Sequence, residues 1–258
     1  MAVCTLHFHG EAIQKASSMN VIFPHRSDVQ GPFPVLYLLH GLSDDHTIWC
    51  RRTSLERYVQ ELPLIVVMPD GGRSFYTDVV EGPPYEQHIM KDVIGFVERA
   101  FNVRTDREGR AIGGLSMGGY GSMKLALKYP DLIGSVVAHS GVYDMRELLT
   151  PDADLHAGTR RIFGDDAIGG PNDVFALAEQ LDPAQAPRIR FDCGVDDGLI
   201  EHNRALHAHL QSLGIPHAYA EYPGAHTWAY WDEHIQEAIA FHWQTLGKIA
   251  ATAHKESE

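Results

Sequence analysis

The sequence predicts an α/β fold built on a mostly parallel, doubly wound β-sheet with helices on both of its faces. Continuous apolar runs of strand length, at residues 35–39 and 64–68, are typical of parallel strands that are buried on both sides. Such runs alternate along the chain with segments whose apolar residues recur at helical spacing. The 258 residues suffice for one domain of this kind over 1–258, and no internal repeat calls for a second.

The N-terminal part of the chain follows a different pattern. Residues 4–8 and 19–23 alternate apolar with polar side chains, which predicts an antiparallel pair of strands with one exposed face. Between the two buried runs, Thr53 and Glu56 have the spacing of a capping box, which predicts a helix that ends near Glu61. The chain is therefore expected to pass from a hairpin into the parallel sheet.

The rest of the chain continues the alternation of strands and helices. Residues 84–101 place apolar side chains on one helical face, whereas 144–187 break the rhythm with many Asp, Gly, Pro and Ala residues. We interpret 144–187 as an insertion over the strand ends that contains one short helix, at about 173–181. The remaining elements are expected to be strands at 111–112, 135–138, 189–191 and 217–222 and helices at 117–129, 199–213 and 233–249.

The composition limits the partners of the protein. The chain has 21 basic and 34 acidic residues and a net charge of −13, so we expect neither nucleic acid nor an anionic membrane as a partner. Its three cysteines, Cys4, Cys50 and Cys193, form neither a disulfide framework nor a metal-binding spacing. No run approaches membrane-span length and the N-terminus lacks a leader pattern, so we expect a cytoplasmic protein.

The segment around Ser116 predicts a nucleophile elbow. Gly114 and Gly118 flank this serine in a G-x-S-x-G pattern directly after a short apolar strand. The serine in such a strand-to-helix turn has a strained backbone, and neighbours without a Cβ let strand and helix approach each other. A serine hydroxyl becomes an effective nucleophile when such a turn holds it against a base. A glycine-rich turn with an incidental serine is the alternative, and the partner residues decide between the two.

Candidate partners occur in the chain order serine, acid, histidine. Asp196 and Asp197 follow a late strand, and His226 follows the last one, where the carboxyl ends of parallel strands meet. One of the two aspartates is expected to cap the next helix, and their spacing leaves both open as the acid. A backbone N–H of residues 40–42 is placed to face a substrate carbonyl opposite that of Met117, as in an oxyanion hole.

Other polar and aromatic residues are expected to be structural. His40 is expected to support the loop that follows it by hydrogen bonding rather than to act as a base. The histidines at 202, 207 and 209 lack a metal-ligand spacing, so we expect them on a solvated helix face. The aromatic side chains within 228–231 are expected to be core that fixes the His226 loop.

Four segments of the sequence together resemble the esterase D family of α/β-hydrolases, especially its tributyrin-esterase branch. The resemblance runs from about Met19 to Trp243 and implies an α/β-hydrolase fold with a small insertion over the active site. Many hydrolases share the elbow alone, but the ordered set is specific. The four segments are LHGLSDDH at 39–46, RSFYTD at 73–78, GLSMGGYG at 114–121 and GAHTW at 224–228.

The resemblance also implies a role for each site residue. Ser116 would be the nucleophile, Asp197 the acid and His226 the base, and the backbone amides of Leu42 and Met117 would form the oxyanion hole. The implied activity is that of a serine carboxylesterase, which cleaves short-chain acyl esters through an acyl-enzyme. This chemistry requires no cofactor and no metal, and the expected partner is a small-molecule ester.

The identity of the substrate stays open. S-formylglutathione hydrolases of the same family usually carry a Gly-Leu-Thr-Cys oxyanion loop, whereas here Leu42 is followed by Ser43 and Asp44. The alternatives are an S-formylglutathione-type thioesterase and an acetyl or feruloyl esterase that acts on decorated carbohydrates. A non-catalytic binding protein of the same fold is the alternative from a different class. The family often self-associates, so a homo-oligomer is also open.

Overall fold

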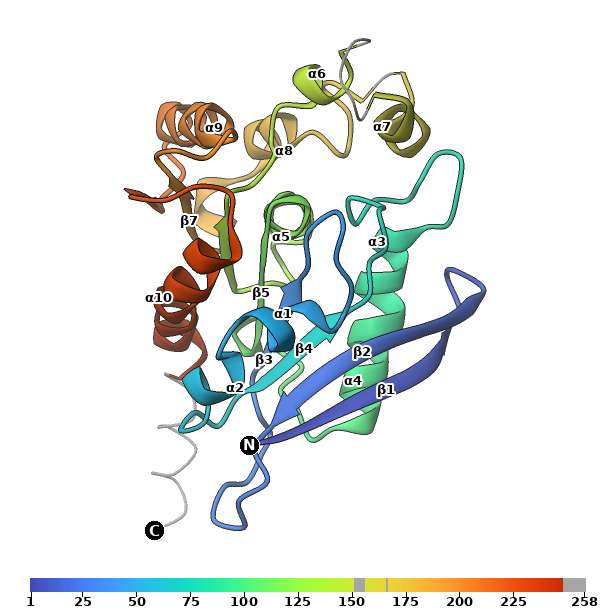
Figure 1. Ribbon diagram of the computed structural model, residues 1–258, viewed down its shortest axis with the longest axis vertical. Helices are drawn as coiled ribbons and strands as arrows, with labels where there is room; N and C mark the ends of the chain where they lie inside the picture. The colour runs from blue at the N-terminus through green and yellow to red at the C-terminus, as the bar shows by residue number, and fades with distance from the viewer. Residues whose placement is uncertain (151–155, 166, 248–258) are drawn as a thin grey trace.

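An eight-stranded sheet forms the centre of the structure, a computed structural model that describes residues 1–150, 156–165 and 167–247 (Figure 1). The strand order is β1-β2-β4-β3-β5-β6-β7-β8. Both pairings of β2 are antiparallel and all the others are parallel, so the predicted N-terminal hairpin and mostly parallel sheet are confirmed. The strands are β1 Ala2–Gly10, β2 Lys15–Phe23, β3 Val35–Leu39, β4 Ile65–Pro69, β5 Arg110–Leu115, β6 Ser135–His139, β7 Arg188–Gly194 and β8 His217–Tyr222.

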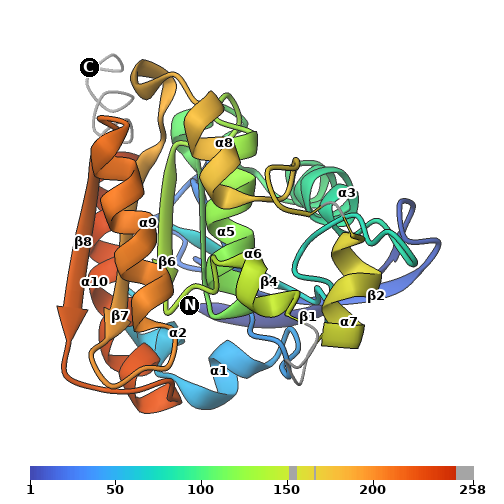
Figure 2. The same cartoon turned by 90° about the horizontal axis from the view of Figure 1, so that it is seen from above.

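Helices cover both faces of this sheet (Figures 1 and 2). The core on one face includes residues of the π-helical turn η1 and of α4 to α9, and the core on the other face includes residues of α1, α2 and α10. The helices are α1 Ile48–Arg52, α2 Leu55–Tyr58, α3 Tyr85–Gln87, η1 His88–Val93, α4 Ile94–Ala100, α5 Met117–Lys128, α6 Met145–Leu148, α7 His156–Phe163, α8 Val174–Gln180, α9 Ile200–Ser212 and α10 Trp228–Leu246, with short 3₁₀ turns η2 Arg107–Gly109 and η3 Pro183–Gln185.

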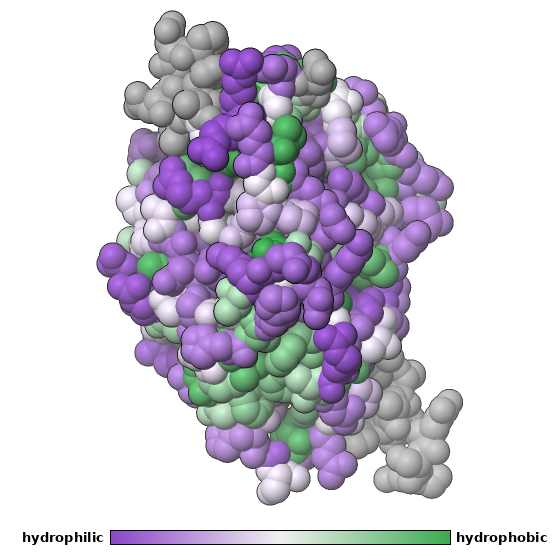
Figure 3. Space-filling model, turned by 90° about the vertical axis from the view of Figure 1, so that its right-hand side faces the viewer, coloured by the Kyte–Doolittle hydropathy of each residue, from purple (hydrophilic) through white to green (hydrophobic). Residues whose placement is uncertain are grey.

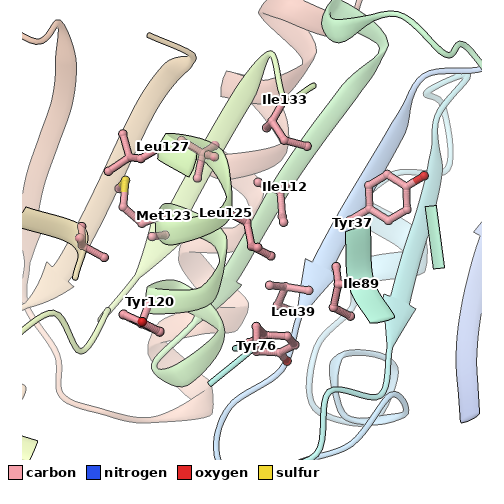
Figure 4. Packing of buried hydrophobic residues seen from close by; sticks show 14 of the residues in the cluster. Tyr37, Leu39, Tyr76, Ile89, Ile112, Tyr120, Met123, Leu125, Leu127 and Ile133 are labelled. Atoms are coloured by element: carbon pink, nitrogen blue, oxygen red, sulfur yellow. The ribbon is translucent and has the colours of Figure 1, made fainter. Parts of the chain in front are cut away.

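The two hydrophobic cores follow from the pleat of the central strands. In β3, Val35, Tyr37 and Leu39 face one core, and Leu36 and Leu38 face the other, because successive side chains point to opposite sides of the sheet. Figure 4 shows the first core, in which side chains of β3 and β5 meet those of α5. Full burial of such an aliphatic side chain stabilises the fold by about 1.5–3 kcal/mol. The packing of many such side chains holds the central strands, and with them the loops at their ends, in place.

The predicted capping box at Thr53 is wrong. The Thr53 hydroxyl donates to the backbone carbonyl of Trp49 (2.6 Å), which ends α1, and accepts the Leu55 amide (3.2 Å). One helix up to Glu61 is therefore replaced by two short helices, the second of which ends at Tyr58. Trp49 is buried in α1 and its Nε1 donates to the carbonyl of Leu39 at the end of β3 (3.1 Å), so tertiary packing overrides the local capping preference.

The segment 144–187 contains more helix than predicted. Its described residues form three α-helices, of which α8 matches the one expected at 173–181, whereas α6 and α7 are additional to the prediction. Both are short, and their apolar side chains pack against the rest of the protein rather than forming a long periodic stripe. Figure 1 shows α6, α7 and α8 gathered at the top of the molecule, above α5. Residues 151–155 and 166 of this segment lie outside the described residues.

The last helix also begins earlier than predicted. α10 starts at Trp228 instead of 233, where the Thr227 side chain accepts the amide of Tyr230 (3.5 Å). This early start carries two aromatic residues of the first turn, Tyr230 and Trp231, into the core beneath the preceding loop. The predicted helix end at Ile249 lies outside the described residues.

One face of the surface combines a hydrophilic majority with a group of apolar side chains. Figure 3 shows that the face on the side of β1 and β2 is mainly hydrophilic, with apolar side chains gathered in its lower half.

Within the described residues, no helix has the length and apolar character needed to cross a membrane.

A buried ion pair joins α5 to α3. Lys124 is wholly buried, and its Nζ donates to Glu86 Oε2 (2.7 Å) and to the carbonyl of Tyr76 (2.6 Å). Glu86 Oε1 also accepts from Lys128 Nζ (2.8 Å) and Tyr129 Oη (2.7 Å). Burial lowers the pKa of Lys124 to about 8. Burial works to raise the pKa of Glu86, but the charge of Lys124 and the hydrogen bonds to the carboxylate lower it overall.

We expect Glu86→Gln to lower the free energy of unfolding by about 3–5 kcal/mol at pH 7, because Lys124 then stays buried without its counter-charge. The folded state lowers the pKa of Glu86, so the stabilisation from this carboxylate is present above its ordinary pKa of 4.5 and is lost as the pH falls below it. Urea unfolding of wild type and variant at several pH values should therefore show that the difference in their free energies of unfolding becomes smaller below pH 4.5.

Two further variants serve as controls for this prediction. Glu86→Gln combined with Lys124→Met removes both charges and should be more stable than Glu86→Gln alone. Glu201→Gln breaks an exposed pair with Arg204 (2.8 Å) and should change stability by no more than about 0.5 kcal/mol. A loss in Glu86→Gln no larger than in Glu201→Gln would contradict the prediction.

Candidate active site

Ser116 occupies a strained turn between β5 and α5. Its backbone angles are φ 53° and ψ −117°, in the region that non-glycine residues rarely adopt. A Cβ at Gly114 would lie 2.5 Å from the carbonyl oxygen of Gly118, and one at Gly118 would lie 2.6 Å from that of Leu39. Neither position can hold a side chain without moving the backbone, which explains the glycines that flank the serine. The turn lifts the serine side chain above the end of β5.

The structure brings together three side chains that are far apart in the sequence. His226 Nε2 lies 3.0 Å from Ser116 Oγ. Its Nδ1 lies 2.9 Å from Oδ2 and 3.1 Å from Oδ1 of Asp197. Because Nδ1 can donate to the carboxylate only when it carries the proton, Nε2 of the neutral ring is left to accept from the serine hydroxyl.

The geometry also separates the two neighbouring aspartates. Asp197 is 3% exposed and accepts the Leu199 amide (2.8 Å) as well as contacting the histidine, so it also closes the turn that leads into α9. Asp196 is exposed, and its backbone N–H donates to the Gly224 carbonyl (2.9 Å). Burial works to raise the pKa of Asp197, but the hydrogen bonds from His226 and the Leu199 amide lower it overall.

The loops that carry the acid and the histidine are held together through their backbones. Besides the Asp196 bond to Gly224, the Val195 amide donates to the Tyr222 carbonyl (2.9 Å). A Cβ at Gly194 would lie only 2.3 Å from the Gly224 carbonyl oxygen, so this approach requires a glycine. The His226 ring stands edge-on against Trp231, with centroids 4.8 Å apart. The predicted aromatic support of the histidine loop is thus confirmed.

The loop after β3 lies directly beside the elbow. A Cβ at Gly41 would be 3.9 Å from the Cβ of Ser116, so the Leu42 amide is close to the serine in space. Met117 is the first residue of α5, where backbone N–H groups have no acceptor within the helix and the helix dipole favours negative charge. The backbone amides of Leu42 and Met117 thus belong to two segments that lie on either side of Ser116.

His40 supports this loop, as predicted. Its Nε2 accepts the Gly71 amide (2.9 Å), so the ring proton is on Nδ1, which donates to the Gly41 carbonyl (2.7 Å). The Tyr76 hydroxyl donates to the His40 carbonyl (2.9 Å). Tyr76 itself has a positive φ of 54° and is held there through its carbonyl by Lys124. Sequence reasoning missed Tyr76 and Lys124, because their roles depend on contacts between distant segments.

A cavity of about 290 Å³ adjoins the site through Leu42. Its walls come from the 73–85 loop and from α7, which are joined by backbone bonds from Val80 and Glu81 to Ile162 and Arg161 (both 3.0 Å). The inner wall is apolar, whereas the charged side chains stand at the rim. The lining residues are Leu42, Arg73, Ser74, Phe75, Val79, Glu81, Gly82, Pro83, Tyr85, Gly158, Thr159, Arg161 and Ile162.

The predicted solvated stripe of histidines on α9 is wrong. His202 is buried and its Nδ1 accepts the amides of Tyr143 and Asp144 (3.2 and 3.0 Å), while its Nε2 bonds Glu147 (2.6 Å). The other two histidines of the stripe are half-buried. The segment around α6 covers this side of α9, and its packing could not be read from helical spacing.

Comparison with known proteins agrees with this geometry. Residues 10–242 match the family model described as "Putative esterase". An acetyl esterase of Caldicellulosiruptor saccharolyticus is 30% identical, with 95% of this chain and 98% of that protein aligned. An esterase of Mycobacterium tuberculosis is also 30% identical, over 85% of this chain and 54% of that protein.

Solved structures give the same result. A substrate-bound, fluorophosphonate-binding serine hydrolase of Staphylococcus aureus superposes with a TM-score of 0.86 at 32% identity, over 93% of this chain and 98% of that one. An S-formylglutathione hydrolase of the same organism gives 0.83 at 31% identity with the same coverage. The sheet order, the strained serine turn and these relatives establish that the protein has the α/β-hydrolase fold, belongs to this esterase family and is a serine esterase.

Proposed function

We propose that the chain, as one α/β-hydrolase domain, hydrolyses short-chain acyl esters of small alcohols with Ser116 as nucleophile, His226 as base and Asp197 as acid. The observation that carries the proposal is the continuous contact from Asp197 through His226 to Ser116, with heavy-atom distances of 2.9 and 3.0 Å. These distances fall within the range that proton transfer requires.

In the proposed mechanism, Ser116 Oγ attacks the ester carbonyl carbon as His226 Nε2 takes the hydroxyl proton. The carbonyl oxygen becomes an oxyanion, which the amides of Leu42 and Met117 stabilise. When the C–O bond to the alcohol breaks, His226 returns its proton to the leaving oxygen. Water then attacks the acyl-enzyme by the same route and releases the acid. Asp197 holds the Nδ1 proton and stabilises the charged ring at each transfer.

The cavity beside Leu42 supports a short acyl group. Its volume of about 290 Å³ lies at the low end of small-molecule pockets, and α7 closes its far side through the bonds to residues 80 and 81. Phe75 and Ile162 give the inner wall an apolar surface. An alkyl chain of a few carbons would be covered there, and a long chain would have to displace α7.

The carboxylate of Asp44 favours a neutral ester over a glutathione thioester. A Cβ at Gly41 would lie 2.9 Å from Asp44 Oδ2 and 3.9 Å from the Cβ of Ser116, so the carboxylate is on the side of Gly41 that faces the elbow. A leaving group that carries carboxylates, such as glutathione, would approach against this charge. The similarity to an S-formylglutathione hydrolase keeps that thioester as the second candidate substrate.

We expect p-nitrophenyl acetate and butyrate to be cleaved rapidly, octanoate slowly and palmitate hardly at all, because the pocket is short. Ser116→Ala should lower kcat by roughly 10⁶-fold, since no other group can form the acyl-enzyme. Initial rates on the four esters, with fluorophosphonate labelling of both proteins, provide the measurement. Equal residual rates in wild type and Ser116→Ala would refute the mechanism.

Asp197→Asn should lower kcat by about 10⁴-fold, because the amide no longer holds the histidine in the tautomer that accepts from serine. Asp196→Asn is the matched control and should leave kcat within about 2-fold, because that side chain is exposed and makes no contact with His226 in the described structure. Steady-state kinetics on p-nitrophenyl acetate would measure both. A larger loss of kcat in Asp196→Asn than in Asp197→Asn would show that Asp196 is the acid.

Asp44→Asn should raise kcat/KM for S-formylglutathione by about 5-fold, because one negative charge near the leaving group is removed. The neutral substrate p-nitrophenyl acetate is the control and should change by less than about 2-fold. Parallel kinetics on the two substrates at low ionic strength would measure the ratio. If wild type already prefers S-formylglutathione to every neutral ester, the thioesterase assignment replaces the carboxylesterase one.

A further inference from the structure

We propose that Ser140, the residue directly after β6, is a positioning residue that holds the Trp231 indole behind the His226 ring. The inference rests on the proposed function, since it concerns the same three site residues. It goes further by assigning a role to a side chain outside the G-x-S-x-G, acid and histidine segments.

The position of Ser140 in the sheet places it among all the segments of the site. β6 lies between β5, which leads to Ser116, and β7, which leads to Asp197. The carbonyl of His139 accepts the Ser116 amide (2.9 Å), and the amide of Ser140 donates to the Asp192 carbonyl (2.8 Å). The end of β6 is therefore bonded through its backbone both to the elbow and to the strand that carries the acid.

The hydroxyl of Ser140 extends this link to the histidine side. Trp231 Nε1 donates to Ser140 Oγ (3.2 Å), and the same indole stands edge-on against the His226 ring. A serine oxygen that accepts from an indole keeps its own proton free to donate. The pKa of Asp197 is lowered overall although burial works to raise it, and proximity of the Ser140 hydroxyl is the smallest of the main causes of this lowering. Ser140 is fully buried and Trp231 nearly so, and a hydrogen bond shielded from water in this way holds its two side chains firmly.

The backbone conformation of Ser140 indicates that its side chain is needed. Its φ is 50°, a conformation that costs a non-glycine residue about 1–3 kcal/mol. Glycine would adopt the same angle without strain. The serine is thus held in an unfavourable conformation, and strain of this kind collects at functional sites because the surroundings fix it.

A second buried cluster holds this corner in place. The Asp192 carboxylate bonds His139 Nδ1 (2.9 Å) and Tyr230 Oη (3.0 Å), and all three side chains are at most 4% exposed. His139 directly precedes Ser140, and Tyr230 directly precedes Trp231 in the first turn of α10. The Asp192 carboxylate therefore anchors the neighbour of each partner in the Ser140–Trp231 hydrogen bond. This rigidity is what a positioning role requires.

We expect Ser140→Ala to lower kcat on p-nitrophenyl acetate by about 10-fold with KM within about 2-fold, because Trp231 loses the hydrogen-bond acceptor that holds it against His226. Ser140→Gly removes the hydroxyl and also the strain, so it should keep the thermal stability of wild type and yet show the same loss of kcat. The matched control is Ser135→Ala at the other end of β6, where a buried serine bonds His242 Nδ1 (2.8 Å). This variant should lower Tm without changing kcat.

A spectroscopic readout separates positioning from general destabilisation. The Nδ1 proton shared by His226 and Asp197 should give a low-field proton resonance in wild type and in Ser135→Ala, and this resonance should shift or broaden in Ser140→Ala. Wild-type kcat and an unchanged resonance in both Ser140 variants would overturn the inference while leaving the triad intact. Retained activity in Ser116→Ala would instead refute the proposed function, so the two failures are distinguishable.

Discussion

The structure depends on the close approach of three backbone segments at the end of β5. The carbonyls of Leu39 and Gly118 lie where a Cβ on the facing glycine would be, and Ser116 is held at a positive φ between them. Such a turn is unfavourable by itself, so it persists only because the buried strands and α5 are packed firmly on both sides. Hydrophobic burial far from the chemistry thus maintains the strained serine.

The polar side chains around the site serve the same end. Lys124 lies about two helical turns beyond Ser116 and holds the carbonyl of Tyr76. The Tyr76 hydroxyl in turn holds the carbonyl of His40, beside the loop that carries Leu42. On the opposite side, Asp192 ties His139 to Tyr230. Each set couples a segment of the site to a buried charge, and a buried charge tolerates little movement because its partners cannot be replaced by water.

The chain order of the site could be predicted because it depends on local patterns. G-x-S-x-G, the paired aspartates and the histidine after the last strand each follow a recognisable strand, and parallel strands bring their carboxyl ends to one edge. The errors occurred where packing overrides local preference. Thr53 ends a helix instead of starting one because Trp49 is buried, and His202 is covered by the segment around α6 rather than by solvent. A single sequence gives no sign of which distant segment covers a given residue.

The sequence by itself determined the sheet type, the elbow and the candidate residues Ser116 and His226, because periodicity and glycine spacing are properties of short segments. Spacing left Asp196 and Asp197 both open as the acid and only the family resemblance implied Asp197, whereas the tertiary structure buries Asp197 against the imidazole and leaves Asp196 exposed. It also decided the size of the cavity and the position of Ser140. Those features arise where α7, β6 and α10 meet the elbow, and contacts between segments so far apart in the chain are fixed by packing alone.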